Sequence, residues 1–258
     1  EARLIERVVD TYVGGAMNPI VPRKFRPAGN EDPFGDAQDE DRLSTPTQAE
    51  RGVFALPNAF DRGYEAGFSG LALRLDSRPP RPASQSGLRL DLAADLGSHR
   101  SEPARGWLRY RAIAGPFLDL NQRARVLSLS VAASFSDPLA DASVPFTELV
   151  QLGGDEPMRG FVPGRLLGRS AAVATLGYHW PVWIWLDGTI QAAVGNVFDR
   201  HLQNFDADLL RFSGALGVRT AGFSDNPVEI LLGFGTETFD DGARLNSLRV
   251  VLGTSRGF

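Results

Sequence analysis

The feature that most restricts the fold of this sequence is an alternation of apolar and polar residues that recurs from about residue 64 to the C-terminus. In the segment 88–96, Leu88 and Leu92 fall on one face of an extended chain, and Arg89 and Asp91 fall on the other. A period of two residues is typical of a β-strand with one wet face. Turn sequences separate nine candidate strands, at 64–75, 88–96, 107–115, 125–135, 170–180, 184–194, 210–219, 228–237 and 248–252. No long helical pattern interrupts them, so the sequence predicts an antiparallel all-β fold, either a sandwich or a barrel.

The alternation does not say which face is wet, because a soluble sandwich buries the apolar face and a membrane barrel turns that face to lipid. The longest nearly unbroken apolar stretch, 180–186, is far shorter than the roughly 18 to 20 residues that a membrane-spanning helix needs. A mean hydropathy of −0.15 is compatible with a barrel, whose strands divide their residues between lipid and lumen.

Three features favour the membrane barrel. Charges of opposite sign occur on the polar faces of neighbouring strands, where they can pair inside a lumen: Arg89, Asp91, Asp95, Arg109 and Arg111. Aromatic residues gather near strand ends, as in an interfacial girdle: Trp107, Tyr178, Trp180, Trp183 and Trp185. The connections also alternate between long and short, which is the asymmetry of external loops and periplasmic turns. We therefore predict an antiparallel transmembrane β-barrel.

The first 50 residues have a different character from the rest. Apolar residues such as Leu4 and Val8 recur at helical spacing in 1–13, which predicts a short amphipathic helix. The following segment, to about residue 50, is rich in Pro, Gly and acidic residues and lacks periodicity, so we expect a flexible acidic linker. The predicted division is thus 1–50 for helix and linker, and 51–258 for the barrel.

Closure of a barrel in lipid requires that no strand edge stay unpaired, and bacterial single-chain barrels have even strand numbers. Val53–Leu56 is the expected tenth strand, with eight or twelve strands as alternatives. The seam, which is the contact between the first and the last strand of the barrel, then joins 51–57 to 245–258. Gly253 and Gly257 weaken the last strand. Ten strands would place both termini in the periplasm.

Composition excludes other classes of function. The net charge of −4 offers no cationic surface for nucleic acid, and the absence of Cys removes thiolate chemistry and Cys-ligated zinc. The three histidines lie in separate segments, and no hydrolase, zinc-protease, nucleotide-binding or dinucleotide motif occurs. We expect neither catalytic residues nor a metal or cofactor.

The long connection between the fourth and fifth candidate strands carries a distinctive motif, formed by Gly153, Gly154, Arg159, Gly160 and Phe161. Two glycines permit a tight reversal, a glycine beside the arginine lets the backbone approach a wall, and a buried arginine needs an acceptor. The stretch resembles the BamA and two-partner-secretion transporter superfamily, also called the bacterial surface antigen family. There a Gly-Gly pair and an Arg-Gly-aromatic tip lie in an external loop that folds back into the barrel. Five strands follow that loop in the family, and five candidate strands follow Phe161.

The resemblance also has departures. In the family an acidic residue on the second strand after the loop holds the arginine, and here Ala193 stands at that position, while Gly177 and His179 replace charged residues on the preceding strand. Asp187 and Glu229, both expected to face inward, are the candidate partners of Arg159. The segment before the first strand is too short for the family's periplasmic domains, and the strand number is below that of family barrels.

The resemblance implies a small outer-membrane barrel that acts in insertion or translocation of proteins or lipids, or as a subunit of such a machine. The terminal Phe258 is similar to the C-terminal signal for insertion of outer-membrane proteins. Its expected partners are outer-membrane lipid and other envelope proteins or barrel-assembly subunits. The alternatives are a structural or passive-pore barrel without transport activity, and a soluble β-sandwich.

Overall fold

In the described part of the chain, ten strands form one antiparallel sheet, in which each strand pairs with the next in the order β1-β2-β3-β4-β5-β8-β9-β10-β11-β12. The computed structural model describes residues 2–9, 64, 66–79, 85–99, 106–121, 123–140, 143–154, 157–220 and 228–254, with only the backbone for 2–9 and 253–254. The strands are β1 (Ala2–Val9), β2 (Ala66–Asp76), β3 (Gly87–His99), β4 (Gly106–Leu120), β5 (Arg125–Leu139), β8 (Ser170–Trp183), β9 (Leu186–Phe198), β10 (Arg211–Thr220), β11 (Val228–Thr238) and β12 (Leu245–Thr254). The predicted all-β antiparallel class is confirmed.

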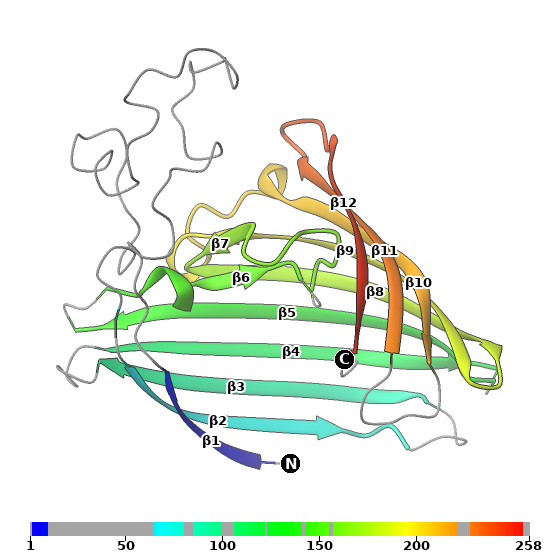
Figure 1. The fold of residues 1–258 in the computed structure, drawn as a ribbon, viewed down its shortest axis with the longest axis horizontal. Helices are drawn as coiled ribbons and strands as arrows, with labels where there is room; N and C mark the ends of the chain where they lie inside the picture. Colours follow the sequence, from blue (N-terminus) through cyan, green and yellow to red (C-terminus); the bar gives the residue numbers. More distant parts are fainter. Residues whose placement is uncertain are drawn as a thin grey trace.

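The sheet is strongly curled (Figure 1). Its two faces differ in chemistry. Large apolar side chains are exposed on the convex face, among them Leu71, Leu88, Val131, Leu176, Leu216, Ile230, Leu248 and Val250. Polar and charged side chains are buried on the concave face, among them Arg89, Asp91, Thr175, Asp187, Ser213 and Glu229. This is the reverse of a soluble sandwich, because a continuous exposed apolar surface marks contact with lipid or another protein.

The connections divide between two rims. The inner loop, residues 143–169, lies between β5 and β8 on the rim that also holds the β9–β10 and β11–β12 connections. The opposite rim holds the short turns between β4 and β5 and between β8 and β9. The ladders place Ala2 opposite Leu73 and Thr254 opposite Val228. The first residue of β1 and the last residue of β12 therefore both lie at this second rim.

The N-terminal prediction was wrong in part, because Ala2–Val9 forms strand β1 and not a helix. The apolar spacing in this segment fits a helical period, but Ile5, Val8 and Val9 are β-branched residues that favour strands. Pairing with β2 satisfies that strand's free backbone groups, which a helix would leave unpaired. The predicted tenth strand Val53–Leu56, like the linker at 14–50, lies outside the described residues. Within the described part of the chain, β1 stands at the sheet edge away from β12.

Trp107 does not belong to an aromatic girdle. Its side chain is fully buried on the concave side, in edge-on contact with Tyr64, Phe68 and His99. Alternate residues of a strand point to the same face, so Trp107 lies on the inward face of β4 with Arg109 and Arg111. The exposed Trp183 and Trp185, together with the stacked pair Tyr178 and Trp180, lie near the turn between β8 and β9.

Candidate functional site

The inner loop lies against the concave face of the sheet and contains the 3-10 turn η3 (Phe146–Glu148) and a two-stranded ribbon, β6 (Val150–Leu152) and β7 (Leu166–Gly168) (Figure 1). Its beginning contacts β4 and the segment that leads into β2, whereas its tip contacts β10, β11 and β12. The loop therefore spans the hollow of the sheet between two groups of strands that are far apart in the strand order.

Glu148 anchors the beginning of the loop. Its Oε1 accepts a hydrogen bond from the Tyr64 hydroxyl at 2.8 Å, and its Oε2 pairs with Arg109 Nη1 at 2.9 Å. The Ser136 hydroxyl on β5 donates to the Glu148 carbonyl oxygen at 3.1 Å. Beneath these bonds a buried apolar cluster joins the loop to the wall: Tyr64, Ala66, Phe68, Trp107 and Val144. The carboxylate is thus removed from water only where it has compensating partners.

Arg159 and Glu229 join the tip of the loop to β11. Arg159 Nη1 lies 3.1 Å from both Glu229 carboxylate oxygens, and the two side chains are only 8% and 3% exposed. In the ladders Glu229 lies opposite Arg219 on β10, and Arg219 lies opposite Asp187 on β9. Asp187 is also buried, so both candidate partners belong to one row of alternating charges that ends beside the arginine of the loop.

Gly160 lets the tip pack directly on the sheet backbone. A Cβ at this position would collide with the carbonyl oxygen of Phe234 on β11. Its N–H donates to Ser213 Oγ at 2.9 Å, and its carbonyl oxygen accepts from Ser247 Oγ at 2.6 Å. Strands on both sides of β11 therefore hold the backbone of this one residue.

Gly153 and Gly154 form the reversal that faces the tip. Their φ angles are +100° and +92°, a region that strongly favours glycine. The Gly154 N–H donates to the Phe161 carbonyl oxygen at 2.9 Å. Arg249 Nη1 on β12 donates to the carbonyl oxygens of Gly154 and Phe161, at 2.9 and 2.7 Å, so a single guanidinium joins both arms of the loop to the last strand.

Phe161 is the centre of a second apolar cluster and is fully buried. The cluster comprises Leu152, Met158, Phe161, Leu166, Ala171, Val173 and Ala193. Ala193 stands where the family resemblance places an acidic partner for the arginine. Here this position is apolar and part of the packing under the loop, and the acidic partner comes from β11.

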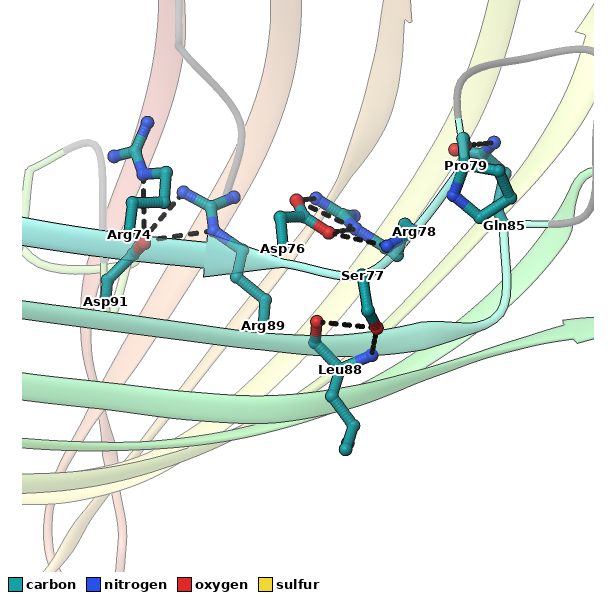
Figure 2. A network of polar contacts seen from close by, with 9 residues as sticks. All are labelled: Arg74, Asp76, Ser77, Arg78, Pro79, Gln85, Leu88, Arg89 and Asp91. Carbon is teal, nitrogen blue, oxygen red and sulfur yellow. Dashed lines mark hydrogen bonds and ion pairs between the residues drawn. The ribbon is translucent and has the colours of Figure 1, made fainter. Parts of the chain in front are cut away.

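Further ion pairs line the concave face near β2 and β3 (Figure 2). Asp91 accepts from Arg74 Nε at 2.9 Å and from Arg89 Nη2 at 2.8 Å. Asp95 lies 3.4 Å from Arg109 Nη2. Of the charges predicted to pair, Arg89, Asp91, Asp95 and Arg109 do so, whereas Arg111 forms no ion pair with a described residue. The residue that links β2 and β3 at Asp91 is Arg74.

Several residues that hold the loop were not predicted. Ser213, Ser247 and Arg249 lie on polar faces of predicted strands, but nothing in their spacing shows that they contact residues some 50 to 95 positions away. Of the remaining predicted positions, Gly253 lies opposite Glu229 in the β11–β12 ladder. Gly257 and Phe258 lie outside the described residues.

In the described part of the chain, His, Asp and Glu side chains form no group of three or more that could hold a metal ion. No helix there is long and apolar enough to cross a membrane.

The fold is similar to that of BamA from Haemophilus ducreyi, in a crystal structure of that protein lacking POTRA domains 1-3. The TM-score is 0.53 with 13% sequence identity, and the match covers 75% of this chain and 43% of that chain. No family model matches the sequence, and no curated protein matches it either. The chain thus spans less than half the length of the BamA structure, and the likeness shows a shared all-β barrel-like fold.

Proposed function

We propose that this chain is a small outer-membrane β-barrel of the BamA type, which assists insertion or translocation of proteins or lipids, alone or as a subunit of a larger machine. The observation that carries the proposal is the attachment of the inner-loop tip to β10, β11 and β12 through Arg159, Gly160 and Phe161. The apolar convex face and the likeness to the BamA barrel support a location in lipid. The proposal assigns the chain no catalytic role and no cofactor.

Orientation follows from the two rims. External loops are longer than periplasmic turns in outer-membrane barrels, so we place the inner-loop rim outside and both termini in the periplasm. The exposed Trp183 and Trp185 then lie near the periplasmic interface of the outer membrane, and Trp is favoured at such interfaces. Phe258 remains the proposed insertion signal, and the last strand, with Gly253 and Gly257, remains the proposed weak side of a seam.

The loop tip is proposed to stabilise the strands nearest the C-terminus during client insertion. A buried ion pair contributes to specificity mainly by fixing one arrangement, and removal of one partner leaves an uncompensated charge. Arg159 and Glu229 can thus hold β11 in one position relative to the loop, while Arg249 and Ser247 do the same for β12.

Client insertion into liposomes tests the proposal. The full chain is reconstituted, and the folding rate of an unfolded outer-membrane barrel client is followed by its shift in gel mobility. We expect faster client folding than in empty liposomes, and loss of most of the gain with Glu229→Gln or Arg159→Gln. Asp240→Asn and Arg125→Gln remove the same charges at exposed sites away from the tip and serve as matched controls.

A second candidate is a passive or structural barrel. The departure at Ala193 favours it, because the family's acidic partner is absent from that position. Equal client folding rates with and without the reconstituted chain would support this alternative and reject the insertase.

A further inference from the structure

Two cavities lie beside the inner loop, and both are lined in part by β3, β4 and β5. The first, which is also lined by β8 and β9, has a volume of about 270 Å³ and extends from Arg89 and Asp91 to Arg159 and Glu229. The other, of about 480 Å³, is lined by Asp95, Arg109 and the beginning of the loop. The two share three lining residues, Arg111 on β4, Ser134 on β5 and Gln151 on β6. The cavities are therefore adjacent, and these three side chains frame the junction between them.

The described residues that line the cavities include more arginines than carboxylates, although the whole chain has a net charge of −4. Six arginines line the two cavities against three carboxylates: Arg74, Arg89, Arg109, Arg111, Arg159 and Arg219, with Asp91, Asp95 and Glu229. Each of these carboxylates is paired with an arginine of the same lining. Arg109 also pairs with Glu148, and Arg219 lies opposite Asp187 in the β9–β10 ladder. Among the described residues, five carboxylates thus offset five of the six arginines, and the positive charge that remains is that of Arg111.

Arg111 lies at the junction of the two cavities. Its side chain is exposed to the hollow, and within the described residues it forms no ion pair or hydrogen bond. In the ladders it lies opposite Ala93 and Ser134, neither of which carries charge. The other groups at the junction, the Ser134 hydroxyl and the Gln151 amide, can also donate hydrogen bonds to an anion.

We propose that the two cavities form one pathway for small anions along the β3–β5 wall, with Arg111 as the residue that determines charge selectivity. Cationic side chains at a constriction select anions because they lower the energy of an anion and raise that of a cation. The chemical class is a small inorganic or organic anion, such as chloride or phosphate. The inference rests on the proposed location in a membrane and is independent of client insertion.

Planar-bilayer recordings of the full chain under a KCl gradient test the pathway. For the wild type we expect a reversal potential between zero and the equilibrium potential of chloride. We call this the chloride side, and the potassium side is the opposite sign. Arg111→Gln should lower the chloride-to-potassium permeability ratio by about a factor of two or more, and Arg111→Glu should move the reversal potential to the potassium side. Arg244, an exposed residue outside both cavities, provides matched controls: Arg244→Gln and Arg244→Glu should leave the potential unchanged.

Three results would overturn the pathway: no conductance by protein that shows folded, heat-modifiable mobility, a wild-type potential at or beyond zero on the potassium side, or an unchanged potential in Arg111→Glu. The client-folding assay separates this inference from the proposed function. Arg111→Gln should leave client folding at the wild-type rate, and Glu229→Gln should impair it. A barrel that conducts anions without assisting clients would reject only the proposed function.

Discussion

Arg159 and Glu229 lie 70 residues apart in sequence, yet Arg159 Nη1 is 3.1 Å from each oxygen of the Glu229 carboxylate. Both side chains are almost completely buried on the concave side of the sheet. This pair joins the tip of the inner loop to β11, and Ser247 and Arg249 join the loop directly to the last strand.

Removal of one member of this pair should destabilise the fold. Glu229→Gln removes the carboxylate that the buried guanidinium of Arg159 contacts, and loss of one partner of a buried ion pair costs about 3 to 5 kcal/mol. The measurement is the urea midpoint of unfolding, read from gel mobility without heating. The double variant Arg159→Met with Glu229→Met buries no charge and should recover most of the loss. Equal midpoints for the wild type and Glu229→Gln would contradict a structural role for the pair.

Gly160→Ala should displace the loop tip. The added methyl group would meet the Phe234 carbonyl, and overpacking of this kind costs typically about 1 to 3 kcal/mol. We expect a lower unfolding midpoint and faster protease cleavage within the inner loop. Gly67 on β2 is the matched control, since a Cβ there has no atom within 4 Å. Indistinguishable cleavage of the Gly160→Ala and Gly67→Ala variants would show that close backbone contact at the tip is not required.

Alkaline pH should weaken the first anchor of the loop. Burial is the main cause that raises the pKa of Tyr64, to about 12 from the ordinary value of 10, and the Glu148 carboxylate adds to it. Because the folded state favours the neutral phenol, its contribution to stability is fully present below pH 10 and is lost as the pH rises towards 12 and beyond. Unfolding midpoints across this range should fall more steeply for the wild type than for Tyr64→Phe. Parallel curves would rule out this linkage.

Single cysteines should report the orientation of the chain, because the natural sequence contains none. Asn204, between β9 and β10, and Asn121, between β4 and β5, are exposed residues with φ of 60° and 63° on opposite rims. A membrane-impermeant maleimide added to intact cells should label Asn204→Cys and spare Asn121→Cys. Lysed cells, in which both sites should react, provide the control. Labelling of Asn121→Cys alone in intact cells would invert the proposed topology.

The sequence was sufficient to predict nine of the ten described strands of the main sheet and their two faces, because alternation is a local property of each segment. Leu88 and Arg89 must point to opposite sides wherever the strand lies. The same parity places Trp107 with Arg109, inside the curl, although the cluster of Trp residues in the sequence suggested a girdle. The first strand could not be predicted in this way, because the apolar residues of Ala2–Val9 follow a helical period and it is pairing with the free edge of β2 that makes the segment a strand.

The motif from Gly153 to Phe161 was likewise visible in the sequence, since positive φ and close backbone approach require particular residues at particular positions. The sequence alone left Asp187 and Glu229 as equal candidates for Arg159, because both lie on polar faces of predicted strands. Only the tertiary structure resolves the bond to Glu229 and shows Ser213, Ser247 and Arg249 around the tip. The physical reason is that an ion pair across the hollow depends on strand register, on the curl of the sheet and on the path of the loop, and all three are set by contacts between distant segments.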